Sequence, residues 1–189
     1  MGYITTYSGE SFNPLAPDMD KIKIEDIAHS LSLMCRGNGH LSHFFSVAQH
    51  CINCAKEAEA RGLAKRVQLA CLLHDASESY LSDITRPVKR HLPVYIEIEE
   101  NMQNAVYRKF LGSVLSEEEC SQVRQIDDDM LVNEFAVLLK HRLVDRVAEL
   151  KSKPFFDIAA FADVKMEFTC IFDRLSSRSD NARHDEIGG

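Results

Sequence analysis

Glycine and proline are scarce in this chain of 189 residues, with 8 Gly and 5 Pro in the whole sequence. Segments that alternate apolar and polar residues, as half-buried strands do, are nearly absent. Almost every patterned segment instead repeats its apolar residues with the period of an α-helix. The shortage of turn formers and strand patterns argues against a β-rich fold and predicts an all-α protein.

Long apolar runs are also missing, and none approaches the about 20 residues that a bilayer-spanning helix needs. The N-terminal stretch MGYITTYSGESFNP lacks the apolar core of a secretory signal. The six cysteines lie mostly within helical apolar patterns, which indicates reduced, buried thiols. We therefore expect a cytoplasmic protein without a membrane partner.

Positive charge is in deficit, with 22 Lys and Arg against 29 Asp and Glu and a formal net charge of -7. Such a chain has no broad basic face for duplex nucleic acid, so we expect no stable nucleic-acid complex. A small anionic substrate would need local positive charge, from a metal ion or from a few arginines.

The patterned segments predict one helical domain over residues 1–177, followed by a polar tail over 178–189 that is expected to be disordered. A short hairpin is expected within YITTYSGESF, and Ser116 with Glu119 matches a capping box that starts a long helix. The expected helices span residues 24–35, 43–61, 65–80, 94–111, 117–139, 141–151 and 157–176.

Two histidines are placed inward by helical phase. His74 follows the apolar positions of the third expected helix, so it faces the core. His50 lies beside an apolar stripe that starts at Phe44 and can turn inward too. Glu78 comes four residues after His74, so in a continuous helix the two side chains share a face.

Three consecutive aspartates lie in the fifth expected helix. Asp127 has Val123 at i-4 and Leu131 at i+4, which places it on the buried face. Asp128 and Asp129 are expected to point toward solvent. Phase therefore selects Asp127 as the anomalous carboxylate of this helix.

His50, His74, Asp75 and Asp127 thus form a set of inward polar groups from three helices. Two imidazoles and two carboxylates suit a divalent transition metal, and nitrogen and oxygen donors are typical of a site with open positions for water and substrate. A lone inward histidine is more often a core residue with one hydrogen-bond partner. The second His-Asp pair, His184–Asp185, lies in the polar tail and is assigned no function.

These residues and their surroundings resemble the HD-domain metal-dependent phosphohydrolases, whose ligand order is H…HD…D. SVAQHC around His50, LLHDASE at residues 72–78 and DITRPVK at 83–89 are similar to the bacterial and phage deoxyribonucleoside 5′-monophosphatases. FNPLAPD and IEDIAHSLSLMCRGNGH are similar to the same subgroup. The resemblance covers roughly residues 10–140 and implies an all-helical domain with one divalent cation, without distinguishing Mn, Co, Fe, Zn or Ni.

The resemblance also implies roles for residues around the expected ligands. Two acidic groups at the open side correspond to Glu78 and Asp83, of which one would orient the attacking water and one protonate the leaving 5′-oxygen. An arginine that binds the substrate phosphate corresponds to Arg36. Lys89 flanks the same loop and is a further candidate for substrate binding, whereas Arg86 is expected at the solvated surface.

Other polar residues have plainer interpretations. Cys51 and Cys54 form a CxxC without a second pair, so two buried small side chains one turn apart are expected. His40 and His43 are expected at a solvated helix start, with His43 also near the mouth of the site. Glu134 is expected to interact with one of the metal-binding side chains without binding the metal itself, or to pair with an arginine.

The expected function is release of phosphate from (deoxy)nucleoside 5′-monophosphates. Hydrolysis of a guanosine polyphosphate, a cyclic nucleotide or a nucleoside triphosphate is an alternative, although Ser79 stands where the HDxxED of guanosine polyphosphate hydrolases has an acid. A non-enzymatic nucleotide-sensing protein is a second alternative, which the presence of both Glu78 and Asp83 disfavours. A homodimer through an apolar face around Ile96 and Met102 stays open, since core packing explains that face equally well.

Overall fold

The computed structural model describes residues 2–140 and 147–177, and it is all-α apart from one small antiparallel hairpin. The hairpin pairs β1 (Ile4–Thr5) with β2 (Ser11–Phe12). The helices are α1 (Ile24–Leu33), α2 (Val47–Ala60), α3 (Lys65–Leu73), α4 (Glu78–Leu81), α5 (Arg86–Lys89), α6 (Pro93–Leu111), α7 (Glu117–Leu138) and α8 (Phe161–Ser176), with short 3-10 turns at Met19–Lys21 and Arg36–Gly39.

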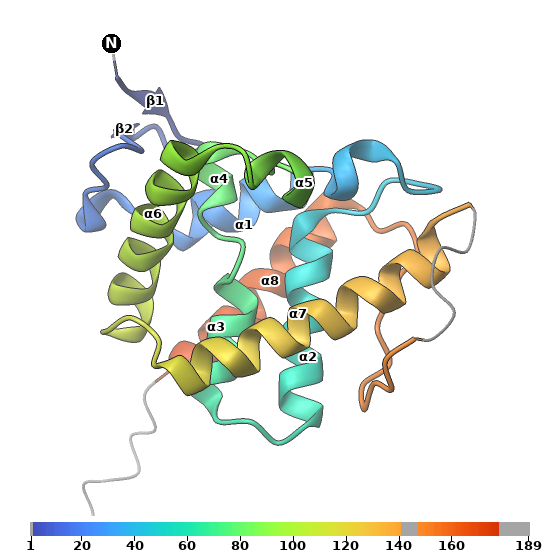
Figure 1. Cartoon of the computed structure of the whole chain (residues 1–189). Coiled ribbons are helices and arrows are strands. Elements are labelled where there is room, and N and C mark those ends of the chain that lie inside the picture. The colour runs from blue at the N-terminus through green and yellow to red at the C-terminus, as the bar shows by residue number, and fades with distance from the viewer. Residues whose placement is uncertain (1, 141–146, 178–189) are drawn as a thin grey trace, which may run out of the picture.

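The helix α2 lies at the centre of the bundle, where it packs against α1, α3, α7 and α8. In Figure 1, α7 crosses in front of α2 and α3, while α6 stands beside α3 and α8 runs behind it. The core between these helices contains Leu31, Ala48, Cys51, Leu72 and Phe168, all fully buried. The helices α2 and α7, which carry His50 and Asp127, therefore meet α3, which His74 and Asp75 follow, at the middle of the molecule.

Capping fixes where two of these helices begin. Ser116 and Glu119 form the expected capping box at the start of α7, and Ser46 with Gln49 forms a second one at the start of α2. Because of this second cap, α2 begins at Val47 and not near residue 43. Phe44, expected in the apolar stripe of this helix, consequently lies outside it and is 39% exposed.

The expected helix over 65–80 is wrong as a single element, since α3 ends at Leu73 and α4 begins at Glu78. Between them the backbone tightens into bonds three residues apart, such as Ala76 N to Leu73 O at 3.0 Å. The side chain of Gln103 on α6 accepts from Ser77 N and donates to Leu73 O. A residue from a distant helix thus stabilises the break.

Two further boundaries differ from expectation. The last helix begins at Phe161, not at 157. The helix expected over 141–151 falls partly outside the described residues, and residues 147–150 are not helical. The chain beyond them is held to α2 by Glu57, which accepts hydrogen bonds from Lys151 N and from Ser152.

The tail over 178–189, including His184–Asp185, lies outside the described residues. Met102 and Val106, part of the apolar face considered for a dimer, are fully buried in the core of this chain. None of the helices in the described ranges combines the length and the apolar character that crossing a bilayer requires.

Candidate metal centre

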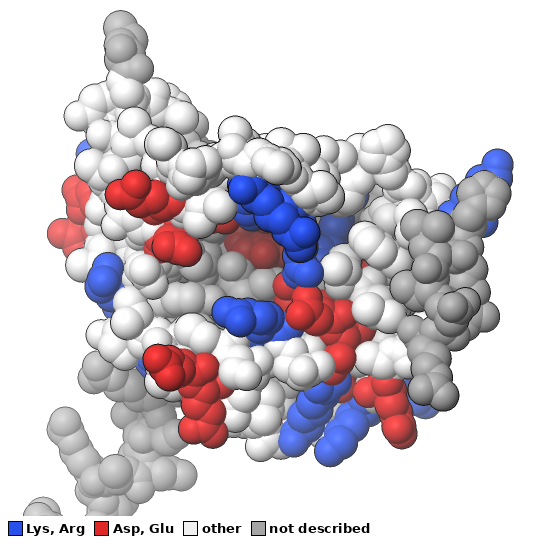
Figure 2. All heavy atoms as spheres, in the orientation of Figure 1, with Lys and Arg blue, Asp and Glu red and all other residues white. Residues whose placement is uncertain are grey.

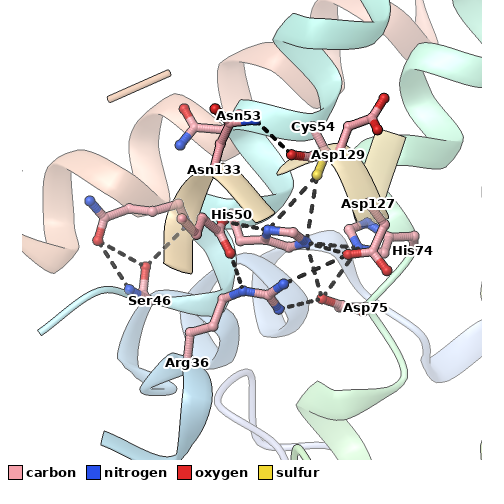
Figure 3. Close-up of polar contacts among 12 residues, drawn as sticks. Arg36, Ser46, His50, Asn53, Cys54, His74, Asp75, Asp127, Asp129 and Asn133 are labelled. Carbon is pink, nitrogen blue, oxygen red and sulfur yellow. Dashed lines mark hydrogen bonds and ion pairs between the residues drawn. The ribbon is translucent and has the colours of Figure 1, made fainter. Parts of the chain in front are cut away.

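The four residues expected to bind a metal converge at one point. His50 projects from α2, His74 caps the C-terminal end of α3, Asp75 follows it, and Asp127 projects from α7. Figure 3 shows their side chains pointing toward one another, with Arg36 beside them. Because α3 ends at residue 73, His74 and Asp75 lie on a tight turn and can both reach the same point.

Short distances join the four groups. His50 Nε2 lies 3.1 Å from His74 Nε2 and 3.1 Å from Asp127 Oδ1. Asp75 Oδ2 lies 3.4 Å from His74 Nε2 and 3.9 Å from His50 Nε2. His74 Nε2 lies 3.7 Å from Asp127 Oδ1. These atoms form the cluster of donors that the sequence predicts.

The hydrogen bonds of the Nδ1 atoms decide which nitrogen of each imidazole is free to bind a cation. His74 Nδ1 donates to the carbonyl oxygen of Cys71 at 2.7 Å, and His50 Nδ1 donates to Glu134 Oε1 at 2.6 Å. In the neutral rings both Nε2 atoms then carry lone pairs. Two such lone pairs at 3.1 Å repel unless a positive charge lies with them.

The charges around the cluster agree with this requirement. The pKa of His74 is raised well above its usual value: burial lowers it, but Asp75 and other partners outweigh burial. The pKa of Asp127 is lowered, because hydrogen bonds and attraction from His50 and His74 outweigh burial. Imidazole and carboxylate groups of this cluster could therefore hold a metal ion.

Arg36 lies inside the same cluster. Its Nε is 2.8 Å from Glu134 Oε2, Nη1 is 3.5 Å from Asp75 Oδ2, and Nη2 is 3.7 Å from Asp127 Oδ1. The side chain is only 12% exposed. Arg36 thus neutralises carboxylates of the cluster, and Glu134 pairs with an arginine as expected while also orienting His50.

Glu78 is a buried acid beside the cluster. It is 6% exposed, and its Oε2 has no hydrogen-bond partner. Burial, followed by the charges of Asp75 and Asp83, raises its pKa well above the usual value. The pKa of Asp83, on the loop after α4, is also raised, by burial and then by Asp75. Both acids expected at the open side are therefore biased toward their protonated forms.

A cavity of about 360 Å³ opens beside Glu78. Lys89 lies in its wall and pairs with Glu99 at 2.7 Å. Figure 2 shows a hollow below α5, between α6 and α7, with acidic side chains inside it and Lys and Arg side chains at its rim. The residues that line the cavity are His74, Asp75, Ser77, Glu78, Lys89, Glu99, Glu100, Gln103 and Asn104.

One expectation about charged neighbours is wrong, and another is incomplete. Arg86 is exposed at the surface, as expected, but its guanidinium also lies 2.6 Å from Asp127 Oδ2 and 2.8 Å from Asp128 Oδ1. Asp129 does not point freely to solvent, because it pairs with Arg61 at 2.9 Å and is as little exposed as Asp127, at 18%. Asp128 is half exposed, as expected, but is held by Arg86.

Comparison with known proteins finds relatives whose names indicate no function. It is 40% identical over 135 residues to the uncharacterized protein YfdR of Escherichia coli K12, which covers 71% of this chain and 71% of YfdR. The chain belongs to the YfdR family. It is also 38% identical over 109 residues to the uncharacterized protein RCAP_rcc00048 of Rhodobacter capsulatus, covering 54% of this chain and 55% of that protein. No family model matches the sequence.

In this YfdR-family chain the cysteines of the CxxC are buried, as expected, but they also approach the cluster. Cys54 Sγ lies 3.5 Å from His50 Nε2. His50, Cys54 and His74 form one group that could hold a metal, and Cys51, His74 and Asp75 form another. Burial raises the pKa of Cys51 to about 11. All six cysteines are free, yet Cys120 and Cys170 are exposed, contrary to the expectation of buried thiols.

His40 and His43 are not among the converging donors. His40 is exposed, and His43 bonds to the carbonyl of Phe156 at 2.8 Å; neither is in α2. The important residue that sequence reasoning missed is Gln103, which holds both ends of the turn that carries His74 and Asp75. No local pattern announces such a contact, because Gln103 lies on α6, far along the chain.

Proposed function

We propose that this protein is a metal-dependent phosphohydrolase of the HD-domain type that releases phosphate from (deoxy)nucleoside 5′-monophosphates. The observation that carries the proposal is the meeting of two imidazole Nε2 atoms and two carboxylates, with both Nδ1 atoms already engaged. The motif order of His50, His74–Asp75 and Asp127 supports the type of enzyme through its resemblance to that superfamily.

The ion would be held by the two imidazoles and two carboxylates. When bound, a divalent ion supplies positive charge that polarises a phosphate oxygen and lowers the pKa of a water molecule toward ~7. We prefer the nitrogen and oxygen donors over the thiol-containing groups, because burial raises the pKa of Cys51 and Cys54 and so makes a thiolate ligand less favourable. Glu134 and the Cys71 carbonyl would keep the two imidazoles oriented.

Glu78 and Asp83 are the proton-transfer groups of the proposal. Glu78 Oε2 is buried without a partner and the pKa of Glu78 is raised, so this side chain suits donation of a proton to the leaving 5′-oxygen. Asp83 lies on the loop at the open side and suits orientation of the attacking water. Neither Arg86 nor Lys89 competes for Glu78, because Arg86 pairs with Asp127 and Asp128 and Lys89 pairs with Glu99.

The neighbouring cavity supports a small-molecule substrate. Its volume of about 360 Å³ lies in the range of ligand pockets, which run from about 300 to 1,000 Å³. Amide groups of Gln103 and Asn104 and the ammonium of Lys89 line it. These groups could contact a sugar or base, while the phosphate lies toward the acids and the metal ligands.

The test is a phosphate-release screen over deoxy- and ribonucleoside monophosphates, triphosphates, cyclic nucleotides and guanosine polyphosphates, with Mn²⁺ or Co²⁺ added. Release from 5′-monophosphates with loss of activity in His74→Ala is expected. Activity confined to another nucleotide class would replace the substrate assignment. Nucleotide binding without turnover of any of them would favour a sensing protein.

A further inference from the structure

Arg86 lies at the outer edge of the donor cluster. It begins the short helix α5, and its side chain is 52% exposed. Its Nη2 donates to Asp127 Oδ2 at 2.6 Å and its Nη1 to Asp128 Oδ1 at 2.8 Å. The guanidinium fork is thus directed at two carboxylate oxygens from different residues.

The two oxygens of Asp127 separate Arg86 from the inner donors by a single carboxylate. Oδ1 faces inward, 3.1 Å from His50 Nε2, and Oδ2 faces Arg86. Arg86 therefore contacts one oxygen of the carboxylate whose other oxygen lies among the inner donors. Among the described residues, Arg86 forms ion pairs with these two aspartates, and its side chain remains half exposed.

Arg36, which the resemblance suggests for phosphate binding, is in a different position. It is 12% exposed and is surrounded by Asp75, Asp127 and Glu134. Its charge is already used to balance these three carboxylates, of which Glu134 is buried. Arg86 keeps an exposed side, so an incoming anion can reach it without first entering the core.

The chemistry of the site requires such a group. A phosphate monoester is a dianion, and it must approach a hollow whose interior carries acidic side chains. A planar guanidinium binds phosphate through two parallel hydrogen bonds, as it binds carboxylate oxygens. The doubly charged phosphate can therefore replace one of the two carboxylates on the Arg86 fork.

From this geometry we propose that Arg86 binds the substrate phosphate, exchanging an aspartate oxygen for a phosphate oxygen when substrate enters. The proposal rests on the proposed phosphohydrolase function. It assigns to Arg86 the contact with the solvent-facing side of the phosphate. Arg36 then neutralises the carboxylates around it, which are those of Asp75, Asp127 and Glu134.

The experiment compares wild type with Arg86→Ala, Arg86→Lys and the control Arg90→Ala. Arg90 is an exposed arginine next to the same short helix, with no ion pair among the described residues. Steady-state kinetics on the substrate found in the screen are combined with calorimetric titration of inorganic phosphate into the metal-loaded protein. Metal content and melting temperature are measured on each preparation.

Arg86→Ala is expected to lower kcat/KM and to weaken phosphate binding by about tenfold or more, with metal content unchanged. Arg86→Lys should recover part of the loss, because it restores the charge without the fork. Arg90→Ala should match wild type. Equal phosphate affinity in Arg86→Ala and Arg90→Ala would overturn the proposal, and so would loss of metal from Arg86→Ala, which would make Arg86 a support for Asp127.

The two proposals fail in different ways. A wild-type protein that releases phosphate from none of the nucleotides refutes the phosphohydrolase. The titration with inorganic phosphate still compares Arg86→Ala with wild type in that case. If the wild type is active but Arg86→Ala leaves KM and phosphate affinity unchanged, only the role of Arg86 is refuted.

Discussion

Replacing Glu78 by glutamine tests the proton-transfer role most sharply, because the two side chains have nearly the same size. Glu78 is buried and its Oε2 has no hydrogen-bond partner, so the change removes an ionisable proton without removing a hydrogen bond from that atom. Packing around the site should be preserved. A change in turnover then reports on chemistry and not on folding.

The expected effect on turnover is large. Loss of a positioned acid lowers the rate by about 10²–10⁴, which corresponds to about 2.7–5.4 kcal/mol in the activation barrier. Metal content should stay at the wild-type level, because Glu78 is not among the four proposed ligands. Glu97→Gln, which changes an exposed acid on α6, is the matched control and should retain wild-type turnover.

The effect on stability has the opposite sign. The pKa of Glu78 is raised in the folded protein, so above the unfolded value of about 4.3 the unfolded chain releases a proton that the folded chain keeps. Ionisation therefore destabilises the wild type progressively as pH rises from that value toward the folded pKa, by about 1.4 kcal/mol per pKa unit of difference. Glutamine does not ionise, so the variant should melt at the same or a higher temperature at pH 7.

The assay measures phosphate release, bound metal by elemental analysis and melting temperature on one preparation of Glu78→Gln. Near-normal turnover with a lower melting temperature would refute the reasoning, since it would mean that Glu78 is a structural residue. Loss of metal would also refute it, because Glu78 would then belong to the ligand set.

Four other predictions concern metal binding and stability. His74→Ala and Asp127→Asn should lose bound metal while Cys54→Ser and Asp128→Asn keep it; metal loss in Cys54→Ser would mean that the thiol-containing group is the real site. Asp129→Asn should keep the metal but lower the free energy of unfolding by about 1–3 kcal/mol, because Arg61 loses its 2.9 Å partner; unchanged denaturant midpoints would contradict this. For Glu57, burial raises the pKa but hydrogen bonds from Ser152, Lys151 and Arg61 outweigh it and lower the pKa. The stabilisation that the ionised Glu57 provides is therefore present above about pH 4.3 and is lost as pH falls through the lowered pKa. Glu57→Gln should be about 1–3 kcal/mol less stable than wild type at pH 7, and this difference in stability should disappear in acid. A constant difference in melting experiments from pH 3 to 7 would disprove the assignment. Chelation of the metal-loaded protein should lower its melting temperature, since an ion at 100 times its Kd stabilises the fold by about 2.7 kcal/mol, and the loss should be absent from His74→Ala.

Several features of the fold follow from local patterns. The bounds of α6 and α7 lie within a residue or two of those expected, and the capping box at Ser116 fixes the start of α7 because Ser and Glu side chains satisfy backbone groups close to them in sequence. The N-terminal hairpin is also confirmed. Helical phase correctly separated Asp127 from Asp128, because the apolar spacing of α7 runs unbroken through the aspartates.

Two of the errors share one cause, which is contact between distant segments. The helix over 65–80 is interrupted where Gln103 binds Leu73 O and Ser77 N. Asp129 pairs with Arg61, the C-cap residue of α2, although the position of Asp129 on α7 predicted that it points to solvent. The periodicity of apolar residues describes one helix at a time and cannot predict a contact with a residue on another helix.

The sequence by itself determined that the chain is helical and that His50, His74 and Asp127 point inward, since both depend on the spacing of side chains within one helix. Only the tertiary structure decided how those residues meet: the direction of each imidazole, set by Glu134 and the Cys71 carbonyl, and the division between an enclosed Arg36 and an exposed Arg86. Those outcomes depend on distances between α2, α3, α5 and α7, and packing of the whole core sets these distances.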